Sequence, residues 1–126
     1  MGVAATHYVV LGVALKDKKK VKEFFAISEK FLDFTEKYDD NGYKDKPTPT
    51  ESGIHMIVDG MCGKYIVIGK ILSKGIEEGL PFTQMTLDDN ERDMGDIYPE
   101  LRKIDRALGT DFNELPLQYL AFTHWH

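Results

Sequence analysis

The sequence predicts an α+β protein of the ferredoxin-like class, a sandwich in which two helices cover one face of an antiparallel sheet. Two runs rich in Val and Ile, 8–15 and 65–72, are near copies of each other. In both runs, the residues that would point to either face of a strand are mostly apolar. Such runs are typical of strands at the centre of a sheet. An aromatic stripe at helical spacing follows the first run. The resulting succession, β-α-β-β-α-β, is the split β-α-β plan of ferredoxin-like folds.

The first strand is expected over His7–Leu15, and Asp17 is expected to cap the helix that follows it. This helix should end near Tyr38, where turn residues begin. Its buried stripe recurs at steps of three and four residues and comprises Phe24, Ile27, Phe31, Phe34 and Tyr38. Residues 43–52 contain two prolines and alternating charges, which indicates a surface loop.

Residues 53–75 predict a β-hairpin, with strands over Ile54–Val58 and from Tyr65 to about Ser73. The second helix is expected over Pro99–Leu108, because proline suits a first helical turn and Gly109 suits a helix end. The last strand is expected over 117–125. An extra short strand is possible over 81–87, and its presence would contradict the β-α-β-β-α-β succession.

The predicted sheet order is 4-1-3-2 with antiparallel neighbours, which places the two most apolar strands at the centre. Two helices can cover only one face of this sheet, although strands one and three are apolar on both. The segment 74–94 or the sheet of a second copy must therefore cover the other face. The partner expected is a second copy, in a homodimer formed through the open sheet face.

The length of 126 residues is expected to form a single domain over 1–126, since a chain of this size buries a core without disulfides. One cysteine, Cys62, allows no internal disulfide and favours a cytoplasmic location. The sequence lacks an apolar run of about 18 residues, so no membrane-spanning helix is expected. The net charge of −5 opposes non-specific attraction to nucleic acid.

Lysines gather at the expected start of the first helix, where backbone N–H groups and the helix dipole favour anions. Lys18, Lys19 and Lys20 weaken such a helix start electrostatically, and this cost points to a phosphate or carboxylate ligand. The alternative is a solvated run of charges. These three lysines are the candidate anion-binding residues.

All four histidines are expected at one end of the predicted sheet. His7 and His55 begin strands one and two, while His124 and His126 end the strand expected beside strand one. Neutral imidazole is a common ligand of zinc, copper and iron. His7, His124 and His126 are therefore the candidate metal ligands, with zinc as the candidate cofactor. The alternative is that they are ordinary polar residues at strand ends.

Tyr8 and Tyr65 lie on the two central strands, where the RNA-recognition sheet carries base-stacking aromatics. The Lys/Arg-Gly-aromatic signature of that sheet is missing, and Gly63–Ile66 keeps only a faint echo of it. RNA binding is therefore the weaker alternative.

The sequence favours binding over catalysis, because it contains no phosphate-binding loop, calcium loop or nucleophile motif. The function expected is that of a small acidic binding protein, a regulator or inhibitor such as bacterial and viral accessory proteins. It would engage a macromolecular partner or a small anionic ligand. The alternative is an enzyme, either metal-dependent through the three histidines or acting on a small substrate in a cavity between the sheets of a dimer.

Overall fold

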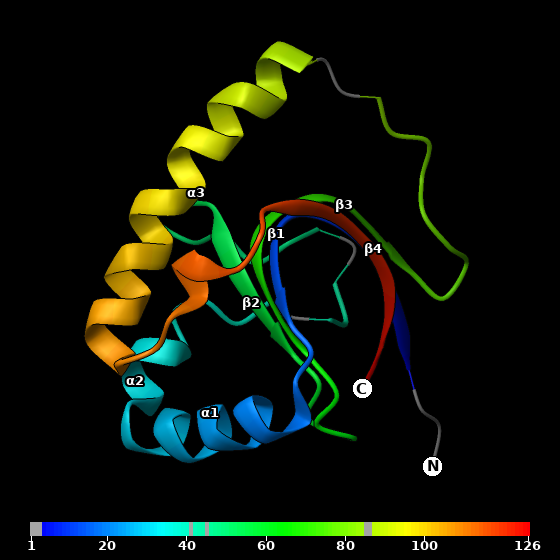
Figure 1. Ribbon diagram of the computed structural model, residues 1–126. Coiled ribbons are helices and arrows are strands. Elements are labelled where there is room, and N and C mark those ends of the chain that lie inside the picture. The colour runs from blue at the N-terminus through cyan, green and yellow to red at the C-terminus, as the bar shows by residue number, and fades with distance from the viewer. Residues whose placement is uncertain (1–3, 41, 45, 85–86) are drawn as a thin grey trace.

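A four-stranded antiparallel sheet forms the centre of the computed structural model (Figure 1). The structure describes residues 4–40, 42–44, 46–84 and 87–126, excepting the side chains of 87–93. The sheet order is β2-β3-β1-β4, which is the expected 4-1-3-2 order read from the other edge. The strands are β1 (Ala5–Leu15), β2 (Ile54–Val58), β3 (Ile66–Ile76) and β4 (Gln118–Trp125).

Three helices complete the α+β architecture, and they depart from the plain β-α-β-β-α-β succession. The expected first helix is broken into α1 (Lys18–Lys30) and α2 (Leu32–Thr35). The break falls at Phe31, where φ is −123° and ψ is 37°. Phe31 consequently leaves the predicted buried stripe and is 43% exposed.

The last helix, α3 (Leu87–Leu108), begins twelve residues before the predicted start, so Pro99 lies inside the helix rather than in its first turn. Proline removes one backbone hydrogen bond from a helix interior. Burial of one face of α3 against the sheet outweighs that loss, because tertiary packing supplies most helical stability in proteins. The buried side chains are Ile97, Leu101, Ile104 and Leu108.

The extra strand considered over 81–87 is wrong in the part of that range that the structure describes. Residues 81–84 have no regular structure, and Leu87 begins α3. The segment runs out to solvent, with Phe82 89% exposed. A surface position of this kind offers no neighbouring strand with which to pair.

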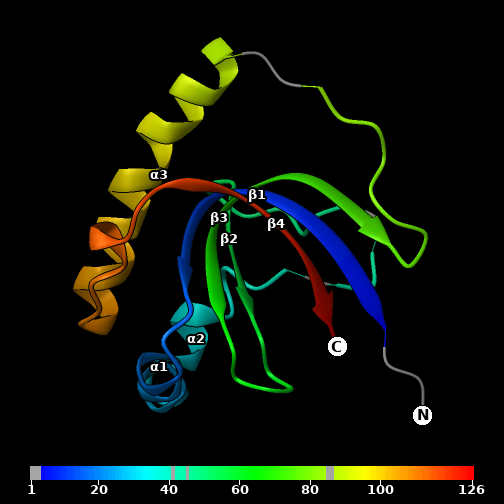
Figure 2. The same cartoon turned by 45° about the vertical axis from the view of Figure 1, so that its right-hand side comes forward.

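One face of the sheet, which we call the helix face, carries the main core. Alternate residues of β1 (Leu11, Val13, Leu15) and of β2 and β3 point to this face and pack against α1 and α3. Phe112, in the 3₁₀ turn Phe112–Glu114 before β4, closes the core at its edge. Both long helices therefore lie on the same side of the sheet (Figure 2).

The sheet is strongly arched, so that its other face is concave (Figure 2). A β-bulge shifts the register of β1 against β3 between Val9 and Val10, and bulges bend the strand that contains them. Gly12 and Gly69 face each other across β1 and β3, where a Cβ on Gly12 would lie 2.1 Å from the carbonyl oxygen of Ile68. The two strands approach so closely here because both residues lack a side chain.

Described residues between 40 and 48, which we call the covering segment, lie over part of the concave face through contacts of Asp40, Gly42, Tyr43 and Thr48. Sequence analysis offered the segment 74–94 or a second copy for this role, and it treated 43–52 as a surface loop. The contact described for Thr83 is instead with Ser73, which is opposite Val9 and on the helix side of the sheet. The chain thus uses part of the loop between α2 and β2 to cover part of its second face.

Candidate functional site

The concave face has a small apolar centre and two polar clusters. The centre consists of Tyr8, Val10, Ile57 and Val67, with half-buried side chains around it. The first polar cluster, which we call the loop anchor, consists of Tyr8, Asp40 and Lys74. The second, which we call the Tyr65–His124 bridge, joins the start of β3 to the end of β4.

The loop anchor fixes the covering segment to the sheet through a buried carboxylate. Oδ2 of Asp40 accepts a hydrogen bond from the Tyr8 hydroxyl at 2.6 Å and lies 2.7 Å from Nζ of Lys74. The side chains of Asp40 and Lys74 are both 1% exposed. Burial, reinforced by the Asp40 carboxylate, raises the pKa of Tyr8 well above its usual range. The loop anchor is therefore an internally satisfied ion pair, and Tyr8, 1% exposed, offers no free ring face to a nucleic-acid base.

A second set of contacts holds the same segment at the end of β4. The hydroxyl of Thr6 donates to the carbonyl of Gly42 at 2.6 Å, so Nε2 of His126 must carry the proton that it shares with Thr6 at 2.7 Å. The ring of Tyr43 packs edge-on against His126, with centroids 4.5 Å apart. His126 is thus engaged in holding the loop.

The Tyr65–His124 bridge exists because of the arch. Tyr65 precedes Ile66, which is opposite Leu15, whereas His124 is opposite Thr6. In a flat sheet this offset along β1 would separate the two residues by roughly 30 Å, at about 3.3 Å per residue. In the structure the Tyr65 hydroxyl lies 2.7 Å from Nδ1 of His124.

Both members of the bridge are half-buried, and burial shifts their titration. The pKa of Tyr65 is raised to about 12 by burial and by the negative charge of Asp59. The pKa of His124 is lowered by burial and by the stacked ring of His126, 5.4 Å away between centroids. At neutral pH the bridge is therefore a phenol hydrogen-bonded to a neutral imidazole.

Asp59 organises the tip of the β2–β3 hairpin and so positions Tyr65. Its carboxylate accepts hydrogen bonds from the backbone N–H groups of Cys62 and Lys64. Burial alone would raise the pKa of Asp59, but these backbone donors outweigh it and hold the pKa below its usual range. The hairpin tip is thereby held in one conformation.

A hollow of about 250 Å³ opens on the concave face beside the bridge. It is wide open to solvent on one side, and its wall is largely apolar. The polar side chains among its lining residues are those of Tyr65 and of Lys16, which is exposed. The residues that line it are Ala14, Lys16, Tyr65, Val67, Leu120, Ala121 and Phe122.

The structure does not bring the three candidate metal ligands together. His7 is opposite Thr123 and bonds to its hydroxyl at 2.9 Å, on the helix side of the sheet, whereas His124 and His126 lie on the concave side. His55 is opposite Gly69 at mid-sheet, since β2 is short. Over the described ranges, no group of three or more His, Cys, Asp or Glu side chains is arranged to hold a metal ion.

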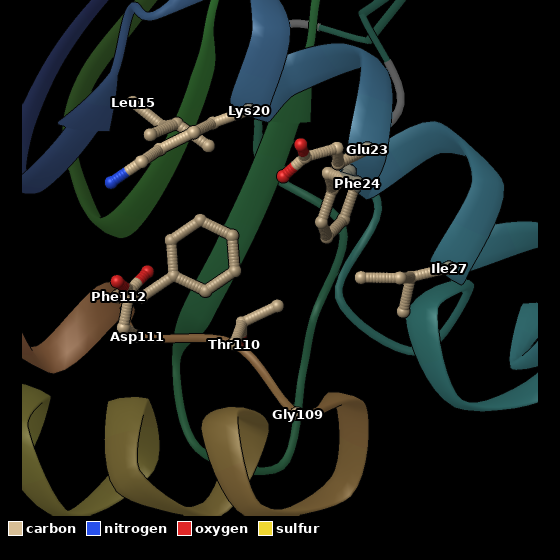
Figure 3. Close-up of a pocket in the computed structure, with 9 residues that line it drawn as sticks. All are labelled: Leu15, Lys20, Glu23, Phe24, Ile27, Gly109, Thr110, Asp111 and Phe112. Carbon is tan, nitrogen blue, oxygen red and sulfur yellow. The ribbon is translucent and has the colours of Figure 1, made fainter.

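The three candidate lysines are placed at the start of α1, as expected. The Asp17 side chain already accepts hydrogen bonds from the backbone N–H groups of Lys19 and Lys20, so those donors are occupied. Lys20 reaches a cleft of about 280 Å³ between α1 and the chain that follows α3 (Figure 3). Glu23 and Asp111 also line this cleft, and their carboxylates oppose the binding of an anion there.

Sequence reasoning missed the residues that make up the concave site. In the sequence, Asp40 lies among the turn residues after the first expected helix, and Lys74 is the first residue of the segment 74–94. Tyr65 and His124 are each singled out, but at opposite ends of a flat sheet. The paired glycines at 12 and 69, aligned in the two similar strands, are the sequence signal that could have indicated the bend.

A scan against protein-family models finds no match for the chain, and comparisons with curated proteins and with solved structures find no similar protein. Within the residues that the structure describes, no helix is long and apolar enough to cross a membrane.

Proposed function

We propose that the protein is a binding protein whose site is the hollow on the concave face, and that its ligand is a small amphipathic anion. The observation that carries this proposal is the composition of the hollow: an apolar wall of Val67, Leu120 and Phe122, lined also by the polar side chains of Tyr65 and Lys16. An apolar pocket with a few convergent polar groups is the usual form of a small-molecule site.

We infer a negatively charged ligand from the charged side chains near the mouth of the hollow. Lys16 lies at the mouth, and Lys64 directly precedes Tyr65 at the exposed hairpin tip. The nearest carboxylate of that tip, Asp59, is buried and is already hydrogen-bonded to backbone donors. The ammonium groups of the two lysines outnumber this one carboxylate, so we expect a local excess of positive charge at the mouth although the whole chain carries a net charge of −5.

The size of the hollow limits the ligand to about one ring or a short acyl chain. Sites for drug-sized ligands usually enclose about 300–1,000 Å³, and this hollow measures about 250 Å³. A carboxylate on an aromatic ring or a short hydrocarbon chain has the matching chemistry. For so small a ligand we expect a dissociation constant of about 1 mM, which corresponds to about −4 kcal/mol.

The loop anchor supports binding rather than catalysis as the role of this face. Asp40, Lys74 and Tyr8 satisfy one another beneath the covering segment, so their charges serve to hold the wall of the site in place. We further propose that the chain is a variant of the ferredoxin-like sandwich and that it works in the cytoplasm as a regulator controlled by this ligand.

Titration of the ¹⁵N-labelled protein with benzoate, followed by amide chemical shifts, tests the proposal. We expect saturable shifts at 65–67 and 120–122. Ala14→Phe should abolish them by filling the hollow, whereas Ala26→Phe, a matched change at an exposed position of α1, should leave them intact. Shifts confined to the start of α1, or no saturable shifts at all, would refute the proposal.

The two lysine groups can be compared in the same assay. Lys16→Gln should weaken benzoate binding severalfold, because it removes the cation at the mouth. Replacing Lys18, Lys19 and Lys20 together with Gln should have little effect. If the triple change weakens binding and Lys16→Gln does not, the anion binds at the start of α1 instead.

A second copy of the chain is a further candidate partner, through the open part of the concave face. The apolar mouth at Leu120 and Phe122 adjoins β4, which is the edge strand of the described sheet. Native mass spectrometry over a concentration series should then show a dimer that Leu120→Lys converts to a folded monomer. A wild-type monomer at all concentrations would exclude this partner.

A further inference from the structure

We propose that Tyr65 and His124 form a proton-coupled sensor for the ligand's anionic group, so that ligand binding places a proton on Nδ1 of His124. This inference rests on the proposed function of the hollow and deepens it. It assigns the recognition of charge to a pair of residues that come from opposite ends of the sheet.

The geometry gives the pair two hydrogen-bonding states. Tyr65 lines the hollow, and its hydroxyl oxygen lies 2.7 Å from Nδ1 of His124. In the state that we assign to the empty site, the hydroxyl donates its proton to Nδ1, and the phenol oxygen offers only lone pairs to a ligand. A carboxylate placed there would face another acceptor and would be disfavoured.

The second state suits an anion. The Tyr65 hydroxyl turns to donate to the carboxylate, and Nδ1 of His124 must then carry a hydrogen that it donates to the Tyr65 oxygen. That hydrogen arrives either with a change of tautomer of the neutral ring or with a proton taken up from solvent. No covalent bond is made or broken in the ligand, and in the second route one proton is taken up for each anion bound.

The surroundings of His124 decide between the two routes. The titratable groups around it are His126 after β4, Tyr8 on β1, Tyr65 before β3, Asp59 at the hairpin tip and Asp40 in the covering segment. In the empty site, burial and His126 keep the imidazole neutral. An anion in the hollow adds a negative charge one hydrogen bond away, which favours the imidazolium. Proton uptake from solvent therefore increases as the pH falls towards the range of histidine titration.

The direction of the pH dependence follows from this linkage. The pKa of His124 is lower in the empty protein than in the complex, so the complex binds more protons at pH values between the two. Affinity for an anion must then rise as the pH falls through that interval, by at most about tenfold per pH unit for one proton. A neutral ligand of the same shape adds no charge, and its affinity should not depend on pH.

Isothermal titration calorimetry with benzoate and with benzamide tests this inference. Experiments in two buffers that differ in ionisation enthalpy, between about pH 5.5 and about pH 8, measure proton uptake directly, and benzoate remains ionised throughout because carboxylic acids titrate near pH 4. We expect fractional proton uptake with benzoate and none with benzamide. Tyr65→Phe and His124→Gln should abolish the uptake, whereas His7→Gln, a histidine on the helix side of the sheet, should leave it unchanged.

A measurement on the wild-type protein keeps the test independent of the folding of these variants. The ring proton on Cε1 of His124, followed by NMR, should titrate at a higher pH when benzoate is saturating. If benzoate binds in the hollow but the titration of His124 does not move, the sensor is refuted and the proposed function stands. If neither benzoate nor benzamide binds to the folded protein, the proposed function itself has failed.

Discussion

The helix face and the concave face bury similar apolar side chains, but they are held by different interactions. On the helix face, fully buried residues of α3 such as Ile97, Leu101 and Ile104 interlock with the strands, and α1 completes the layer. On the concave face a smaller apolar cluster is surrounded by an ion pair, two tyrosine hydroxyls and two histidines. The difference teaches that the helix face carries stability, whereas the concave face depends on polar contacts that conditions and ligands can change.

The largest expected effect comes from breaking the loop anchor. Lys74→Met leaves the Asp40 carboxylate buried without its cation, and the loss of one partner from a buried ion pair typically costs about 3–5 kcal/mol. Urea denaturation followed by circular dichroism measures this cost. The double change Lys74→Met with Asp40→Leu should recover much of the loss, because it leaves no unpaired charge. A loss from Lys74→Met no larger than that from a surface lysine such as Lys22→Met would contradict the assignment.

A pair of truncations compares the two faces directly. Ile104→Ala on the helix face removes a fully buried side chain and should cost about 2–5 kcal/mol of unfolding free energy. Leu120→Ala at the open hollow should cost clearly less, since that side chain is only partly buried. Equal losses from the two changes would show that the hollow is closed in solution, by a second copy or by a change in the arch.

The close approach of β1 and β3 can be tested through Gly12. A Cβ at this position would lie within 3 Å of backbone atoms of β3, which cannot move aside as a side chain can, so Gly12→Ala should cost about 1–3 kcal/mol. Gly60→Ala is the matched control, because a Cβ there meets nothing within 4 Å. Gly12→Ala should also weaken the Tyr65–His124 bridge by flattening the arch, seen as a change in the NMR signals of His124. A variant as stable as wild type would argue against the close approach.

The smallest expected effect is on the pH dependence of stability. The pKa of His124 is lowered by burial in the folded protein, so the unfolded chain binds more protons between that value and the ordinary histidine pKa of about 6.5. Stability should therefore be full above about pH 6.5 and fall as the pH drops below it, by about 1.4 kcal/mol for each unit of pKa shift. Thermal unfolding of His124→Gln should lose this component, whereas His7→Gln should retain it.

Much of the architecture could be predicted from local patterns. The bounds of β2 are those predicted, and the other strands differ only at their ends, because Val and Ile runs between turn residues are strong local signals. The helices were predicted less well. Phe31 fits the apolar spacing yet ends α1, and Pro99 resembles a helix start yet lies within α3.

The candidate site could not be predicted from the same patterns. Placing residues on a flat sheet puts Tyr65 and His124 far apart and gathers His7 and His55 with the other histidines. The strand alternation, the short β2 and the arch each overturn part of that picture. Asp40 and Lys74, 34 positions apart in the sequence, offer no local sign that they will meet.

The sequence by itself determined the number, type and order of the strands and the presence of a second apolar face that needs cover. It did so because alternation, turn residues and helical spacing act over a few neighbouring residues. Only the tertiary structure decided that the sheet arches, that Asp40, Gly42, Tyr43 and Thr48 cover part of the concave side, and that Tyr65 meets His124. These features depend on small backbone rotations that accumulate along strands of eleven residues. A pattern of a few neighbouring residues does not determine the total bend.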